Sequence, residues 1–198
     1  MKSNLEPPLA PPLAPPGAGL PRIELLIARL LFATQRATGN VATFNSRLER
    51  ERTTIRRLLQ GLEGDAAARR VLIRRPPGLE DSSRYWSVWM TLEHLRMVNE
   101  GAVRVITGLT HGTMPPGKAS TAAVKPSPQV TGAVVGEYEK SCDALSAAAA
   151  GGKLRTPLRF PHPWFGPLDA AGWHALATVH LGLHRVQIER IIAGLRTL

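Results

Sequence analysis

Apolar residues recur at three- and four-residue steps through most of this chain, which is the spacing of helices that bury one face. The first stripe comprises Ile23, Leu26, Ile27, Leu30, Leu31, Val41, Phe44, Leu48, Ile55, Leu59 and Leu62. Arginines and glutamates fill most of the other positions, and the Gly39-Asn40 pair interrupts the pattern. We therefore predict a long or kinked first helix, or two helices in series, from Pro21 to about Gly61.

Clusters of proline and glycine divide the next part of the chain and set the ends of a second helix. The linker over residues 74–80 contains Pro-Pro-Gly, which stops helix formation. The Asp81-Ser82-Ser83 stretch offers side chains that can cap a helix N-terminus, so we predict a helix over Tyr85–Ile106. A loop rich in glycine and proline follows over residues 108–125.

Two more helices are predicted in the C-terminal half. Ser127-Pro128 is expected to open a third helix, because serine caps helices and proline suits their first turn. That helix should end at Gly151-Gly152, and Asp169 can cap a fourth helix that runs to about Gly194. No segment shows the alternation and flanking turns of paired strands. The predicted fold is therefore all-α, a four-helix bundle.

The segment before the first helix has a different character. Residues 1–21 contain seven prolines within a short Pro-Pro-Leu-Ala repeat and lack the continuous apolar stretch of a secretory signal. Such a sequence favours polyproline II, so we predict a disordered tail over residues 1–21 and a bundle domain over residues 22–198. A ligand for an SH3-type domain is the alternative reading of the tail.

Composition and charge narrow the choice of partners and compartment. The single cysteine, Cys142, excludes an internal disulfide and suits a reducing compartment, so we expect a cytoplasmic protein. No run of about 18 apolar residues is present, so we expect no membrane partner. The formal charge of +10 lies mostly in residues 22–75, where 12 arginines accompany five acids as on a solvated helix face. No nucleic-acid motif accompanies it, and we do not expect nucleic acid as a partner.

Histidines carry the strongest chemical signal. His180 and His184 lie four residues apart, so they differ by about 40° around a helix and project from one face. Apolar neighbours place that face, and also His94, toward the bundle core. Three inward imidazoles can hold a divalent cation. The alternative is a set of hydrogen-bonded core histidines, and the absence of a glutamate after His180 removes the zinc-protease motif.

Three stretches resemble the DinB-like superfamily of metal-binding four-helix bundles. They are residues 85–95 (YWSVWMTLEHL), residues 162–168 (HPWFGPL), and Trp173 followed by the last-helix pattern His180-x-x-x-His184-x-x-Gln187. The resemblance implies an up-down-down-up bundle in which His94, His180 and His184 coordinate one divalent ion. Zinc, nickel and iron all suit three imidazoles.

The resemblance also implies a function and a mode of assembly. Relatives commonly form homodimers, and several act on low-molecular-weight thiols. We expect a metal-dependent transferase or hydrolase that acts on a small thiol or a related small molecule. The alternative is a non-catalytic bundle that binds metal or a small ligand for a structural or stress-response role. Gln187, His162 and Trp173 are candidates for the surroundings of the metal or the wall of a pocket.

Overall fold

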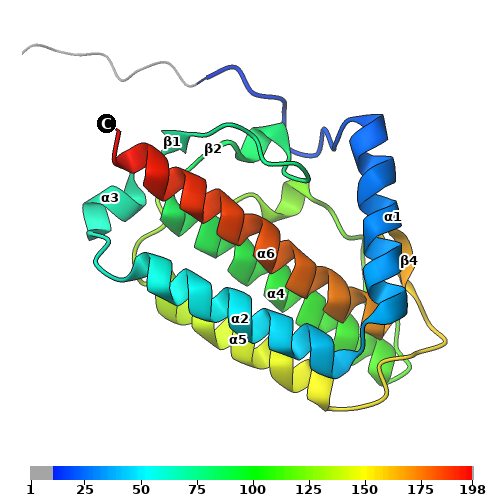
Figure 1. The fold of residues 1–198 in the computed structure, drawn as a ribbon. Coiled ribbons are helices and arrows are strands. Elements are labelled where there is room, and N and C mark those ends of the chain that lie inside the picture. The colour runs from blue at the N-terminus through cyan, green and yellow to red at the C-terminus, as the bar shows by residue number, and fades with distance from the viewer. Residues whose placement is uncertain (1–10, 198) are drawn as a thin grey trace, which may run out of the picture.

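Four long helices lie side by side in the computed structural model, which describes residues 11–197 (Figure 1). They are α2 (Val41–Leu59), α4 (Val88–Thr110), α5 (Val134–Ala150) and α6 (Ala170–Leu195). Helices α2 and α6 run in one direction along the bundle, and α4 and α5 run in the opposite direction (Figure 1). The predicted all-α, up-down-down-up four-helix bundle is confirmed.

The direction of the helices explains the longest connection. Because α4 and α5 are parallel neighbours, the chain must return over the length of α4, about 35 Å for 23 residues, before α5 begins. Residues 111–133 make this crossing and include the short 3₁₀ helix η2 (Ala122–Val124). The crossing runs along the bundle and brings Val124 against His94.

The predicted first helix is two helices in series, α1 (Arg22–Thr38) and α2. Gly39 is extended and a Cβ there would lie 2.6 Å from the Phe44 ring, so the break depends on a small residue at this point. The Asn40 side chain accepts a hydrogen bond from the Thr43 amide at 2.9 Å and caps α2.

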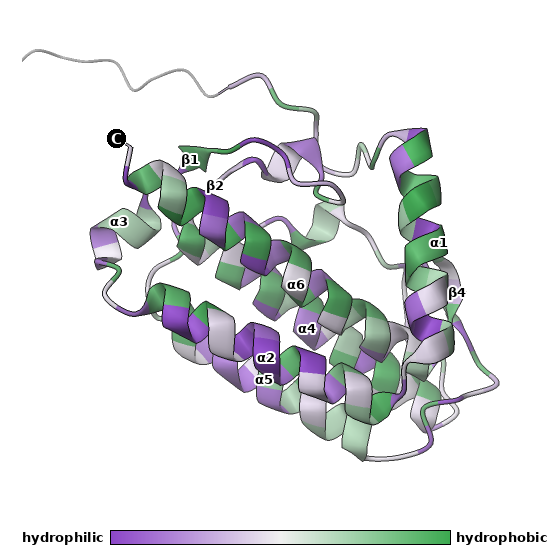
Figure 2. Ribbon diagram, viewed as in Figure 1, coloured by the Kyte–Doolittle hydropathy of each residue, from purple (hydrophilic) through white to green (hydrophobic). Residues whose placement is uncertain are grey.

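Helix α1 stands across one end of the bundle rather than continuing it (Figure 1). Its ends are fixed by two ion pairs, Glu24–Arg75 and Arg36–Asp169, at 2.6 and 2.7 Å. Because α1 has left the bundle direction, the bundle does not cover its predicted apolar stripe, and Figure 2 shows how many residues of α1 are hydrophobic. The stripe side chains that are 53–76% exposed are Ile23, Leu26, Ile27, Leu30 and Leu31.

The start of α4 differs from the prediction. Asp81–Ser83 form the 3₁₀ helix η1 and do not cap a helix, and Tyr85–Trp86 form strand β2. The N-cap of α4 is Ser87, whose hydroxyl accepts from the Met90 amide at 3.1 Å. The turn at η1 is needed because β2 must first run back along β1 (Val71–Leu72), with Val71 opposite Trp86.

Of the predicted starts of the last two helices, one agrees with the structure and one does not. Helix α5 starts at Val134, and Ser127 makes only a local turn with the Gln129 amide, so the proposed cap at Ser127-Pro128 was wrong. Asp169 caps α6 as expected, accepting from the Gly172 amide at 2.8 Å. The cap at Asp169 could be predicted from the sequence. A Ser-Pro pair fits a turn as well as the start of a helix, so the pair at residues 127–128 did not identify a helix start.

Short strands were not predicted and two antiparallel pairs are present. Besides β1 with β2, strand β3 (Phe160–His162) pairs with β4 (Gly166–Leu168), and His162 lies opposite Gly166. Each strand has only two or three residues, too few to show an alternating pattern. A five-residue helix, α3 (Gly64–Ala68), completes the described elements.

The part of the proline-rich segment that the structure describes lies against the bundle domain. The Ala14 amide donates to Asp81 Oδ2 at 2.9 Å, and the Gly17 amide donates to Glu80 Oε2 at 3.2 Å. Ala14 and Gly17, within the segment predicted to be a disordered tail, thus contact the domain because their backbone amides meet two carboxylates. The remainder of the predicted tail, residues 1–10, lies outside the described residues.

The core collects fully buried side chains from all four bundle helices. The largest include Leu48, Ile55, Leu92, Leu95, Ile106, Tyr138, Leu145, Leu181, Ile188 and Ile191. None of the described helices combines the length and apolar character that a bilayer crossing requires.

Candidate metal centre

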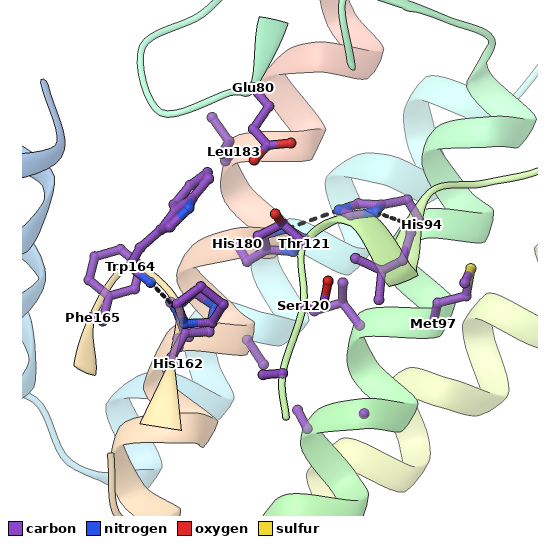
Figure 3. Close-up of a pocket in the computed structure, with 18 of the residues that line it drawn as sticks. Glu80, His94, Met97, Ser120, Thr121, His162, Trp164, Phe165, His180 and Leu183 are labelled. Carbon is purple, nitrogen blue, oxygen red and sulfur yellow. Dashed lines mark hydrogen bonds between the residues drawn. The ribbon is translucent and has the colours of Figure 1, made fainter. Parts of the chain in front are cut away.

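The three predicted histidine ligands lie together in the structure, one on α4 and two on α6. The Nε2 atom of His180 lies 3.1 Å from Nε2 of His94 and 3.0 Å from Nε2 of His184. His94 and His184 are buried, and His180 is half-buried. Figure 3 shows His94 and His180 facing each other across the edge of a pocket. The helical spacing and the α4–α6 packing therefore direct three ring nitrogens at one point.

Neighbouring acceptors set the proton positions on two of the rings. His94 Nδ1 donates to the Val124 carbonyl at 2.7 Å, and His184 Nδ1 donates to Gln187 Oε1 at 2.6 Å. The Gln187 amide is oriented in turn because its Nε2 donates to the Ser83 carbonyl at 2.7 Å. With both Nδ1 atoms protonated, the Nε2 atoms of His94 and His184 present lone pairs to the common point.

The donor set fits a divalent cation. Two nitrogens about 2.1 Å from one ion lie roughly 3.0–3.4 Å apart at ligand angles of about 90–109°, which agrees with the separations from His180. Without an ion, His180 can donate one Nε2 proton to only one of its two neighbours, while its buried Nδ1 has no hydrogen-bond partner among the described residues. These three side chains are thus suited to hold a metal ion.

Burial also keeps the cluster uncharged. Desolvation lowers the pKa of His94 to about 4, although the Val124 hydrogen bond and the nearby Glu80 charge act in the opposite direction. Burial lowers the pKa values of His180 and His184 well below the usual range, and repulsion between the rings adds to this. Neutral imidazole is the form that binds a metal.

The cluster opens into a cavity of about 760 Å³ whose surface is mostly apolar. Trp86 stacks against His184 with ring centroids 6.2 Å apart and an interplanar angle of 10°. Trp164 and Phe165 lie across the cavity from His94 (Figure 3). A small molecule therefore has room beside the three histidines and a largely dry surface to contact.

The three other residues predicted near the site have different roles: Gln187 contacts a histidine of the cluster, whereas Trp173 and His162 line the cavity. Gln187 is fully buried and orients His184, as described above. Trp173 lines the cavity, and its indole nitrogen donates to the Phe160 carbonyl at 3.1 Å. His162 also lines the cavity but is not part of the three-histidine cluster, and its Nδ1 accepts from the Trp164 amide at 3.2 Å.

Several groups around the site gave no signal in the sequence. The carbonyls of Val124 and Ser83 act through the backbone, which every residue possesses. Glu80 lines the cavity from the loop before α4, and a lone loop carboxylate forms no recognisable pattern. Pro16 and Leu20 also line it, although they belong to the segment for which the sequence predicts a disordered tail.

The remaining histidines and the cysteine lie outside the three-histidine cluster. His111 is exposed at the end of α4 and bonds only the Thr107 carbonyl. His174 is buried beside Phe44, with ring centroids 6.0 Å apart. Cys142 is buried in α5, where desolvation raises the pKa of its thiol to about 11.

Comparison with known proteins agrees with this architecture. The family model of the DinB superfamily matches residues 47–188, more than half of the chain. The crystal structure of TT2238, a four-helix bundle protein, aligns with a TM-score of 0.57 and 21% identity, covering 76% of this chain and 98% of that chain. At this identity the likeness concerns the fold. No curated protein matches the chain.

Proposed function

Because the chain belongs to the DinB superfamily and three of its imidazoles converge, we propose that it holds one divalent metal ion through His94, His180 and His184. We further propose that it is a metal-dependent transferase or hydrolase acting on a small thiol or a related small molecule. Zinc, nickel and iron are the metals that this donor set suits best.

The observation that supports metal binding is the convergence of three Nε2 atoms, with those of His94 and His184 lying 3.1 and 3.0 Å from that of His180. The second support is the position of the cluster at the wall of a cavity of about 760 Å³. A metal that served only to join helices would not need an adjoining space of this size. His94, His180 and His184 all line this cavity, so a ligand inside it can approach the cluster.

The residues around the cluster orient the imidazole rings and give the cavity a mostly apolar surface. Val124 and Gln187 hold two rings by their Nδ1 protons, so the Nε2 lone pairs stay directed at one point. Three neutral ligands leave the positive charge of a bound ion intact, which favours an anionic partner such as a thiolate. When bound, the ion would supply Lewis acidity that lowers the pKa of a thiol or water in contact with it.

Metal analysis of the purified full-length chain tests the first part. We expect one equivalent of divalent metal per chain and a melting temperature that falls on chelation. His184→Ala should abolish stoichiometric binding, whereas the matched control His111→Ala removes an exposed imidazole and should retain it. A wild-type protein that neither retains nor takes up metal would overturn the proposal.

Turnover separates the enzyme from a non-catalytic metal-binding bundle. The loaded protein is mixed with small thiols and electrophilic acceptors, and the loss of free thiol is followed over time. An enzyme predicts turnover that His184→Ala removes with a modest change in stability. A structural metal predicts no turnover and a large loss of stability in the same variant.

The homodimer expected from the family remains a proposal, and α1 offers a surface for it. Its outward stripe repeats at helical spacing from Ile23 to Leu31, so two copies of α1 can pack antiparallel about a twofold axis. Light scattering after size-exclusion chromatography should give twice the chain mass of 21.4 kDa. Leu30→Glu, at a side chain that is 69% exposed, should give monomers if this face is the interface.

A further inference from the structure

Glu80 stands out among the charged residues that line the histidine cavity. Its side chain is 9% exposed, and of the charged lining residues within 11–197 it alone is buried. Arg96 is half-buried and its charge is shared with Glu93 and Glu100 at 2.8 and 2.7 Å. The remaining basic lining residues are exposed, namely Arg104, Lys118 and Lys125. The buried part of the cavity therefore carries negative charge.

The two oxygens of the Glu80 carboxylate differ in their surroundings. Oε2 accepts from the Gly17 amide at 3.2 Å and from the Ser82 hydroxyl at 3.3 Å. Oε1 is buried and has no hydrogen-bond partner among residues 11–197. A desolvated carboxylate oxygen without a donor is costly, and a donor from a ligand would remove that cost. Oε1 is itself closed off from the cavity, so a ligand donor reaches it when the carboxylate turns about its Oε2 hydrogen bonds.

The geometry of the cavity indicates which kind of donor fits. Figure 3 shows Glu80 reaching from the loop above the cavity toward the side where His180 lies, with Trp164 nearby. Aromatic faces attract cations as well as apolar groups, and Trp164 and Phe165 both line this cavity. A positive N–H donor suits a buried carboxylate beside aromatic rings better than a neutral or anionic group does.

We propose that Glu80 binds the ammonium group of a small ligand and makes the cavity selective for aminothiols. The ammonium donates to Oε1, and the thiol end points toward the three histidines. Glu80 lies outside the histidine cluster, so one molecule must span the distance between the two. The thiol part of this inference rests on the proposed function, whereas the ammonium part rests on Glu80 alone.

Binding to the metal-free, full-length protein tests the ammonium site directly. The probes are phenethylamine and 2-phenylethanol, which have the same shape and differ in the charged group, with 3-phenylpropionate as the anionic counterpart. Affinities are measured by calorimetry and by tryptophan fluorescence. We expect the amine to bind about tenfold to a hundredfold more tightly than the alcohol, the range for one charged hydrogen bond.

Two neighbouring substitutions make the test specific. Glu80→Gln should abolish the preference for the amine while leaving alcohol binding unchanged within about twofold. Asp81→Asn removes the adjacent carboxylate, which does not line the cavity, and should keep the preference. Equal binding of amine and alcohol, tighter binding of 3-phenylpropionate, or an equal effect of both substitutions would overturn the inference.

The metal-loaded protein then tests the thiol end with cysteamine and 2-mercaptoethanol. Tighter binding of cysteamine by about tenfold or more, lost in Glu80→Gln, supports an aminothiol ligand. Equal affinities for the two thiols overturn it. A protein that fails to bind metal but still prefers phenethylamine supports the Glu80 site and contradicts the proposed function, so the two failures are distinguishable.

Discussion

Two regions of the bundle bury polar groups, and they do so in opposite ways. Between α2 and α5, Arg52 is 6% exposed and donates to Glu139, to Asp143 at 2.6 Å and to the Glu139 carbonyl at 3.1 Å. Its buried charge is matched by protein groups. Between α4 and α6, the histidine nitrogens point at one another and His180 Nδ1 has no partner among the described residues.

The difference separates a structural network from a binding site. A buried charge that is fully hydrogen-bonded holds two helices in register and leaves nothing for a ligand. Lone pairs that converge beside a cavity remain costly until something else occupies the point between them. Substitutions in the α2–α5 network should therefore change stability and spare metal affinity, while those around the histidines should change metal affinity.

The largest effect is expected for Arg52→Met. Removal of the guanidinium leaves the mostly buried Glu139 with Arg56 as its ion-pair partner, so unfolding free energy should fall by roughly 3–4 kcal/mol. Metal affinity should stay within about twofold of wild type. Urea unfolding of the metal-free protein measures the first quantity and competition with a chelator the second.

The control for this prediction is Arg57→Met at a neighbouring exposed arginine, where a change below about 0.5 kcal/mol is expected. A loss in Arg52→Met as small as in the control would mean that the network contributes little. A large loss of metal affinity in Arg52→Met would show that the α2–α5 network and the histidine cluster are energetically coupled.

His174 provides a third case, a buried imidazole with neither a protein partner nor a convergent neighbour. Both ring nitrogens lack hydrogen bonds within the described chain, and burial lowers the pKa to about 4 from an ordinary value of 6.5. Between these pH values the unfolded state binds the additional proton. Native stability is therefore lost as pH falls from 6.5 toward 4, by up to about 3 kcal/mol for this residue.

His174→Leu should remove that part of the acid sensitivity. We expect a variant about 1 kcal/mol more stable at pH 7, with an advantage that grows by about 3 kcal/mol, to about 4 kcal/mol, near pH 4. Urea midpoints of both metal-free proteins across this pH range give the comparison, and the other histidines affect both alike. Parallel stability curves for the two proteins would contradict an unpaired His174.

Gln187 belongs to the histidine region although it contacts no metal-binding nitrogen. Its oxygen accepts from His184 Nδ1 and its nitrogen donates to the Ser83 carbonyl. Gln187→Leu should lower metal affinity about tenfold to a hundredfold because His184 loses its orientation. Gln187→Glu keeps the acceptor and should lose less, which a chelator competition can resolve.

The fold was largely predictable from the sequence because each bundle helix buries a regular stripe. The break at Gly39-Asn40 could also be located, although its consequence could not. The stripe from Ile23 to Leu31 has the same periodicity as a core stripe, and only the turn of α1 away from the bundle exposes it. Periodicity reports one apolar face and not what covers that face.

The residues of the candidate site also fall into two groups, those that a single-helix pattern predicts and those that only the packed structure brings to the site. The pair His180 and His184 follows from helical spacing, and His94 from its inward face, because both are properties of single helices. Val124, Ser83 and Glu80 come from loops whose positions depend on the packed bundle. Backbone carbonyls and a single carboxylate leave no spacing rule to follow, so they required the structure.

The smallest effect is expected at Cys142. This residue of α5 tests from the α2–α5 region whether that region is independent of the histidines. The thiol is fully buried in α5, near the α2–α5 network, and burial raises its pKa to about 11. At pH 8 its thiolate fraction is about a hundredfold lower than for a thiol with the ordinary pKa of 9. Alkylation by iodoacetamide in the folded protein should be slow, and urea should accelerate it strongly.

Repeating the alkylation after chelation of the metal tests whether the α2–α5 region and the histidine region are independent, and not only whether Cys142 is buried. Because Cys142 contacts Asn99 and lies outside the histidine cluster, its alkylation rate should change by less than about twofold when metal is removed, provided that folding is intact. A rate that rises with chelation in parallel with the loss of metal would show that the ion holds α5 in place. The metal would then be structural for the whole bundle, and the α2–α5 network would not be independent of the histidines.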